Sequence, residues 1–433
     1  MAGQPREQIN QLEQGFWAYV KRQYKKNKRA MAALYIVAFL ALIALFADFI
    51  ANEKPIIAKY KGKIVMPIFK SYAVDFGLTQ WDKDFQNVNW KKLDYDWKIL
   101  PPIPYLPQNI DFKNARFVSP FGKQRVDSKR YWHWMGTDNL GRDVLSGMIH
   151  GTRIAFLVGI ISMSISSFIG IVLGTLAGYF GDSRLLMSRG RIFMNIFGFL
   201  FGLFYAFGSR SYILTDALGD SIGAFMGQLL ISIGIFAIIM IVANVIAYLL
   251  KLIPWVKDRV AFPMDLVVSR LIEILMTIPT FFLIITIVAV VKPHIFWVMV
   301  IIGATAWTGI ARLIRAELLK IRNLEYIEAA QALAYPELRT MFRHAMPNAL
   351  SPVLIAIAFG IAVAILVEST LSFLGVGTAA DTITWGKLLA ASRQSASAWW
   401  LAIFPGLAIF LTVLIFNLIG EGLSDALDPR LKK

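Results

Sequence analysis

Cysteine is absent from this chain of 433 residues, and charged residues make up only 17% of it. Without a thiol the chain can form no disulfide bond, no thiolate metal site and no cysteine nucleophile. Soluble domains carry about 25% charged residues, whereas 57% of this chain is hydrophobic. A composition so poor in charge is that of a protein that crosses a membrane several times.

Acidic residues and nucleotide-binding motifs are also scarce. The 44 Lys and Arg residues outnumber the 28 Asp and Glu residues, which gives a formal charge of +16. Such an excess can indicate nucleic acid binding, but in so apolar a chain the enrichment of Lys and Arg in cytoplasmic loops explains it, and we expect no nucleic acid partner. The chain has no G-x-x-x-x-G-K-[ST] phosphate loop and only four histidines, so we expect no bound ATP, metal, cofactor or catalytic residue.

Long apolar runs are abundant instead. The runs long enough, or nearly so, to cross a bilayer as a helix are 31–50, 154–180, 192–208, 227–250, 271–291, 295–314, 349–371 and 399–418. Basic residues before the first run place the N-terminus in the cytoplasm, and an even number of spans returns the C-terminus there. We predict an all-α polytopic membrane protein with about eight spans, in contact with membrane lipid.

Residues 51–150 contain no run of this length. Short stretches in which apolar and polar residues alternate, together with prolines and aromatic residues, predict a folded domain outside the membrane. We expect Trp81, Trp90, Trp97 and Tyr105 to build its core. The segment GTDNLGRD, residues 136–143, is rich in Gly, Asn and Asp and has the wrong spacing for a calcium loop. We interpret it as turn and helix-cap chemistry.

The polar stretch EYIEAAQALAYPELRTMFRHAMPN, residues 325–348, separates two of the most apolar runs. A short helix is predicted over 324–334, ended by Tyr335 and Pro336, since proline disfavours helical geometry in the residue before it. Pro336 suits the first turn of a second helix, and Asn348 is a plausible N-cap for the next span. The expected product is a rigid helical knob on the cytoplasmic side.

Two motifs in this stretch carry a family resemblance. EAAQALA followed by HAMPN is similar to the EAA loop of permease subunits of binding-protein-dependent ATP-binding-cassette (ABC) importers, although Ala334 stands where that family has Gly. HWMGTDNLGRDVLSGMIHGTR and ESTLSFLGVG resemble segments of the dipeptide, oligopeptide and nickel permeases. The outer loop also resembles the subfamily associated with microcin C and larger peptides.

The resemblance implies a MetI-like core of about six helices in a bacterial inner membrane. It divides the chain into a cytoplasmic segment (1–30), a first span (31–50), an exterior domain (51–150), a second span (151–182), an inserted hairpin (183–263), the rest of the core (264–420) with its EAA loop (324–348), and a tail (421–433). The implied partners are a second permease subunit, two cytoplasmic ATPases and an exterior substrate-binding protein. The residues implied in ATPase docking are Glu328, Ala329, Ala330, Ala334, His344, Pro347 and Asn348.

Other readings remain open from the sequence. Glu273 and Glu368 lie in apolar runs, where acids are often functional, but both are near span ends and could reach the interface instead. A nickel or small-solute permease would share these motifs. A self-sufficient carrier would be expected to show discontinuous helices and an internal repeat, and neither is apparent in the sequence. In a structural or signalling protein the predicted helical knob would have no role.

Overall fold

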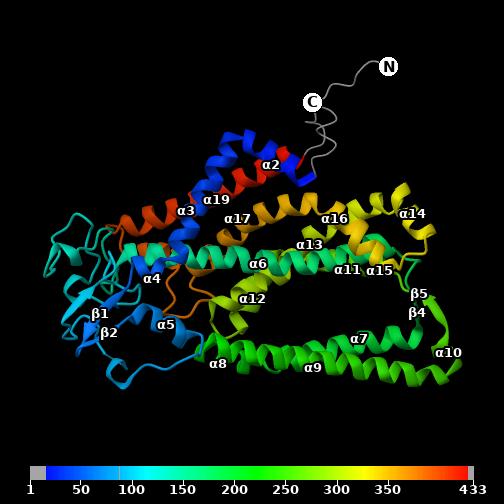
Figure 1. Ribbon diagram of the computed structural model, residues 1–433, viewed down its shortest axis with the longest axis horizontal. Helices are drawn as coiled ribbons and strands as arrows, with labels where there is room; N and C mark the ends of the chain where they lie inside the picture. Colours follow the sequence, from blue (N-terminus) through cyan, green and yellow to red (C-terminus); the bar gives the residue numbers. More distant parts are fainter. Residues whose placement is uncertain (1–15, 87, 428–433) are drawn as a thin grey trace, which may run out of the picture.

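A computed structural model describes residues 16–86 and 88–427, so the outermost parts of the predicted N-terminal segment and tail lie outside it. Long helices run side by side, with a small sheet domain (residues 51–143) at one end and the EAA loop at the other (Figure 1). The helices long and apolar enough to span a membrane are α3 (Lys28–Leu45), α6 (Val144–Phe180), α7 with its continuation α8 (Arg189–Leu203 and Ser211–Asp220), α9 (Ile222–Leu249), α13 (Ile295–Ile321), α17 (Ser351–Phe373) and α19 (Trp400–Leu427).

The predicted span at 271–291 is not one straight helix. It forms α11 (Met264–Thr277) and α12 (Thr280–Val290), which are bent by 83° at the break between them. Ile278 is extended there because the following Pro279 disfavours helical geometry in it. The described residues therefore contain seven spans, or eight if the bent pair is one span, and the expectation of no discontinuous helix is wrong.

Helices α6 and α13 pack at very short range through glycines spaced four residues apart. A Cβ atom added at Gly174 would lie 2.5 Å from the carbonyl oxygen of Ala311, and one at Gly178 would lie 2.9 Å from that of Arg315. Positions four apart share one helix face, so the glycines form a flat strip that admits the backbone of α13. Helices α17 and α19 pack beside this pair.

The hairpin of α7, α8 and α9 lies alongside the bundle (Figure 1). Its two chain ends meet: strand β4 (Leu186–Ser188) pairs antiparallel with β5 (Arg259–Ala261), and the N–H of Phe262 donates to the carbonyl of Leu185 over 2.8 Å. The N–H of Leu266 donates to Oδ1 of Asp182 over 2.9 Å. The chain thus leaves the core and returns to it at one place.

The sheet domain is folded around aromatic rings. Its strands are β1 (Ile57–Tyr60), β2 (Lys63–Val65) and β3 (Trp97–Ile99), in the antiparallel order β2-β1-β3. Trp90 and Tyr105 are buried, Trp81 is half-buried, and Trp97 is 44% exposed, so the expected core role of Trp97 is wrong. The shorter α-helices outside the loop include α2 (Phe16–Lys26), α4 (Ala47–Ile50), α5 (Pro67–Asp75), α10 (Pro254–Lys257) and α18 (Trp385–Ala391).

Candidate functional site

The EAA loop begins with helix α14 (Glu325–Ala332), close to the predicted bounds. The helix ends in two hydrogen bonds, from the N–H of Tyr335 to the carbonyl of Ala330 (3.2 Å) and from the N–H of Ala334 to that of Gln331 (2.9 Å). This pairing is the Schellman motif, in which the residue after the cap takes left-handed geometry and is usually glycine. Ala334 has a φ of +55°, which explains why the family pattern has Gly at this position.

Replacing Ala334 by glycine should therefore stabilise the loop. A left-handed conformation costs an L-residue about 1 kcal/mol, and glycine removes most of that cost although it loses more entropy on folding. We expect Ala334→Gly to slow limited proteolysis within 324–348. Ala329→Gly is the matched control, because glycine inside α14 should accelerate cleavage; acceleration by both changes would contradict the strain argument.

One face of the loop is fixed to the bundle. Ile327, Met341, Ala345 and Ala349 are fully buried in one apolar cluster with Leu318 of α13 and with Tyr179 and Phe180 of α6. The loop therefore moves with α6 and α13. Of the residues implied in docking, Ala330 is also buried and so is not available to a partner, whereas Glu328 and Ala329 are exposed.

The second half of the loop is continuously helical, through α15 (Glu337–Thr340), the π-helical turn η6 (Met341–Ala345) and α16 (Met346–Ala349). His344 lies in η6, with its ring stacked on that of Tyr335 at 6.3 Å between centroids, and Pro347 occupies the first turn of α16. Asn348 donates to the carbonyl of His344 (2.8 Å) and to the hydroxyl of Tyr326 (3.2 Å). The prediction that Asn348 caps the next span is wrong, because the backbone stays helical to Leu350.

Three exposed apolar side chains of the loop were not singled out in the sequence. Leu333 is 68% exposed, Leu338 58% and Phe342 51%. Leu338 and Phe342 are four residues apart on a helical segment and so share a face. Their signal was present in the sequence, as large apolar residues inside a polar stretch.

The two acids in apolar runs have different surroundings. Glu273 is exposed and accepts a hydrogen bond from Nη1 of Arg270 over 2.6 Å. Glu368 is 1% exposed and accepts from the hydroxyls of Ser372 (2.6 Å) and Ser369 (3.4 Å). Interfacial exposure thus describes Glu273 and not Glu368, which lies where α18 packs on α17: a Cβ at Gly386 would be 2.3 Å from the carbonyl oxygen of Ser369.

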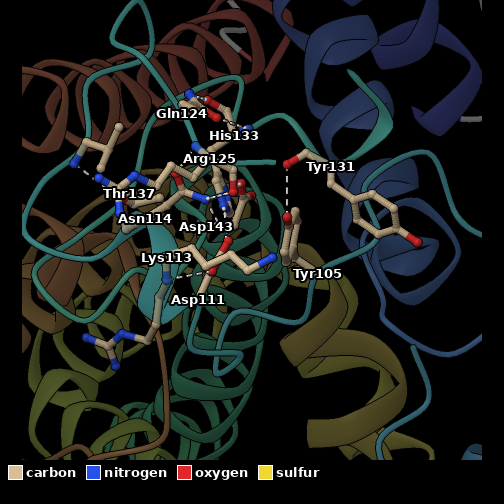
Figure 2. Close-up of polar contacts among 12 residues, drawn as sticks. Tyr105, Asp111, Lys113, Asn114, Gln124, Arg125, Tyr131, His133, Thr137 and Asp143 are labelled. Carbon is tan, nitrogen blue, oxygen red and sulfur yellow. Dashed lines mark hydrogen bonds and ion pairs between the residues drawn. The ribbon is translucent and has the colours of Figure 1, made fainter. Parts of the chain in front are cut away.

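At the opposite end of the bundle, a buried histidine joins the sheet domain to α6 (Figure 2). His133 is fully buried, with Nδ1 2.7 Å from Oδ2 of Asp143 and Nε2 3.3 Å from Oδ2 of Asp111. Asp143 also caps α6 by accepting from the N–H of Ser146 over 2.6 Å. Gly136 and Gly141 have φ of +75° and +82°, so the interpretation of GTDNLGRD as turn and cap chemistry is confirmed.

The contacts of His133 with Asp111 and Asp143 should weaken in acid. Burial opposes ionisation of Asp111, but hydrogen bonds from Asn114 and His133 outweigh it and hold the pKa of that carboxyl below its usual range. A carboxyl with a lowered folded-state pKa stabilises the fold above its unfolded value of about 3.9, and this stabilisation is lost as pH falls through the folded-state pKa. We expect the unfolding temperature of the sheet domain, followed by tryptophan fluorescence, to drop below about pH 4.

Asp111→Asn should lower the unfolding temperature at pH 6. It should also reduce the further fall of the unfolding temperature in acid. Asp127→Asn is the control, because the Asp127 side chain is 85% exposed in its ion pair with Lys113. Parallel pH profiles for the wild type and Asp111→Asn would contradict the assignment.

Comparisons with known proteins agree with this architecture. The family model described as "binding-protein-dependent transport system inner membrane component" matches residues 259–433, and "N-terminal TM domain of oligopeptide transport permease C" matches residues 15–62. The chain is 28% identical to the peptidoglycan transport system permease protein YejE of Agrobacterium fabrum, over 94% of this chain and 92% of that protein.

Two further relatives extend the comparison. The inner membrane ABC transporter permease protein YejE of Escherichia coli is 28% identical over 97% of this chain and 98% of its own length. A putative peptide transport system permease protein of Brucella suis is 42% identical over 39% of this chain and 57% of its own length. The chain belongs to the family of inner membrane permease components of binding-protein-dependent transport systems, in its OppC- and YejE-like branch.

Proposed function

We propose that this permease carries peptides across the inner membrane as one of two permease subunits of an ABC importer. In this proposal two ATPase subunits bind and hydrolyse ATP, and an exterior binding protein delivers the substrate. The peptide class is supported by the printed names of the relatives, among them an oligopeptide permease of Haemophilus influenzae and a dipeptide permease of Alkalihalophilus pseudofirmus.

The observation that carries the proposal is the two-sided EAA loop. Its buried side is continuous with the apolar cluster of α6 and α13, while Glu328, Ala329 and the apolar Leu338 and Phe342 are exposed. A partner that moves the exposed side therefore moves the spans as a rigid body. We assign Glu328, Ala329, Leu333, Leu338 and Phe342 to the ATPase contact, and Ala330, Ala334, His344, Pro347 and Asn348 to its support.

This assignment puts the loop and both chain termini in the cytoplasm and the sheet domain outside. We propose that the sheet domain docks the binding protein at the outer mouth of the pathway. Deleting it whole is a poor test, because Tyr105 accepts from Ser146 of α6 and His133 joins the domain to Asp143. Glu368 is proposed to hold α17 and α18 together rather than to bind substrate, because it is buried where these helices meet.

One observation favours a second candidate, a carrier that works without ATPases. The bent pair α11 and α12 is a discontinuous helix of the kind that lines the sites of secondary transporters. The EAA loop would have no role in such a carrier, and for that reason the importer is preferred. A permease for nickel or another small solute is the alternative within the importer class.

The decisive experiment is uptake by proteoliposomes that hold this permease with its partner subunits and binding protein. We expect uptake of a labelled peptide to require ATP on the side of the membrane that the ATPase subunits face. This chain alone, without its partner subunits, should take up no peptide. ATP-independent uptake by the chain alone would establish the carrier, and ATP-dependent uptake of Ni²⁺ without peptide uptake would establish the small-solute permease.

A further inference from the structure

A hollow in the membrane-embedded bundle points to a residue that selects the substrate. It has a volume of about 610 Å³ and lies between α6, α13 and α17. Small residues open it, among them Ala306 and Gly309 on α13 and Ala356 and Gly360 on α17. This volume is within the range of about 300–1,000 Å³ that is typical of small-ligand sites.

The hollow has a single charged residue in its lining, Arg312, and no acid. Arg312 is exposed, and among the described residues it has no hydrogen bond or ion pair. Arg315, one turn further along α13, differs from it: Nε and Nη2 of Arg315 both donate to the carboxylate of Asp265. Asp265 therefore neutralises Arg315, whereas the guanidinium of Arg312 is left available to a ligand.

The position of Arg312 fits a role at the end of the pathway. It is 17 residues from the start of α13 at Ile295, about 26 Å along a helix that rises 1.5 Å per residue. The hydrocarbon core is about 30 Å thick, so Arg312 lies near the membrane boundary on the side of the EAA loop. A solute that follows the hollow from the sheet-domain side meets Arg312 after the apolar lining.

We propose that Arg312 binds a carboxylate of the transported peptide and so makes this permease selective for peptides with a free carboxyl group. The inference rests on the proposed function. The planar guanidinium forms two parallel hydrogen bonds with a carboxylate, a geometry that neither an amide nor a lysine side chain reproduces. The carboxylate can come from the C-terminus or from an Asp or Glu side chain of the peptide.

The test measures ATP-dependent uptake by the complete complex in proteoliposomes. The substrates are an apolar tripeptide with a free C-terminus, the same tripeptide amidated, and an amidated tripeptide with one Asp. Wild type should favour the free tripeptide over its amide. Arg312→Gln should lower uptake of the free tripeptide by about tenfold or more and leave the apolar amide within about twofold of wild type, which abolishes the preference. Arg312→Lys should keep an intermediate preference.

Arg29→Gln is the matched control, because Arg29 is exposed outside the hollow; it should retain the wild-type preference. If Arg312→Gln lowers uptake of the amidated Asp peptide as well as the free one, the side-chain carboxylate is also bound. Equal loss for the free tripeptide and its amide would overturn the inference, since it indicates that Arg312 pairs with a lipid or a partner subunit. No wild-type preference would overturn it too, with the proposed function intact, whereas uptake of none of the peptides by wild type would overturn both.

Discussion

Glu328→Lys should lower ATP-dependent uptake by at least about 30-fold, the factor that corresponds to an interface hot spot of about 2 kcal/mol. The Glu328 side chain is exposed on α14 and makes no hydrogen bond or ion pair with the described residues. Its replacement therefore removes no contact within the subunit, and the loss should come from the partner that the loop contacts. Uptake is measured in proteoliposomes, and copurification of the ATPase measures assembly.

The control for this change is Glu421→Lys, which reverses a charge at another exposed position. Glu421 lies near the C-terminal end of α19, outside the EAA loop. It should leave uptake within about twofold of wild type, as surface substitutions usually do. Ala330→Trp is not a clean probe, because Ala330 is buried and the large ring would disturb the loop itself. Normal uptake by Glu328→Lys, with normal ATPase copurification, would exclude the docking role.

Gly174→Leu should strongly destabilise the folded permease. A Cβ at this position would lie 2.5 Å from the carbonyl oxygen and 3.0 Å from Cα of Ala311, and backbone atoms cannot rotate away as a side chain can. Overpacking commonly costs 1–3 kcal/mol, and separation of α6 from α13 should cost about 3 kcal/mol or more. The expected result is loss of the monodisperse peak in detergent and a lower unfolding temperature.

Gly234→Leu is the control, because it shows whether a leucine in place of glycine in a membrane helix is destabilising wherever it is introduced. Gly234 lies inside α9, and a Cβ there would meet no atom within 4 Å, so the side chain should be accommodated with yield and unfolding temperature close to wild type. A similar loss in both variants would show that the glycine strip of α6 has no special role.

Much of this architecture follows from local sequence. The long apolar runs coincide with the long helices because a bilayer demands about 20 apolar residues for each crossing, and α14 follows from its alanines and the break after it. The bend at Pro279 has a signal in the sequence, a proline inside an apolar run, but a run of about 20 apolar residues by itself favours a single straight span.

The remaining details depend on contacts between distant residues. Whether Ala329 or Ala330 is buried depends on how α14 rotates against α6 and α13. The burial of Glu368 is tolerable because Ser369 and Ser372 donate to it, which composition does not reveal. The partners of His133 come from residues 22 positions before it and 10 after it, and no spacing rule brings Asp111 to that ring.

The meeting of β4 and β5 has a consequence for the ancestry of the chain. Because the two strands hold the ends of the hairpin a hydrogen bond apart, from Leu185 to Phe262, a coding segment could be gained or lost there in a single event. A two-residue Asn-Gly turn would close the same ladder without α7, α8 and α9. The hairpin therefore joins the core at one place in the chain. Its far end also contacts α13, where Nε1 of Trp297 donates to the hydroxyl of Thr215 over 2.9 Å, so a chain that lost the hairpin would need a new partner for this tryptophan.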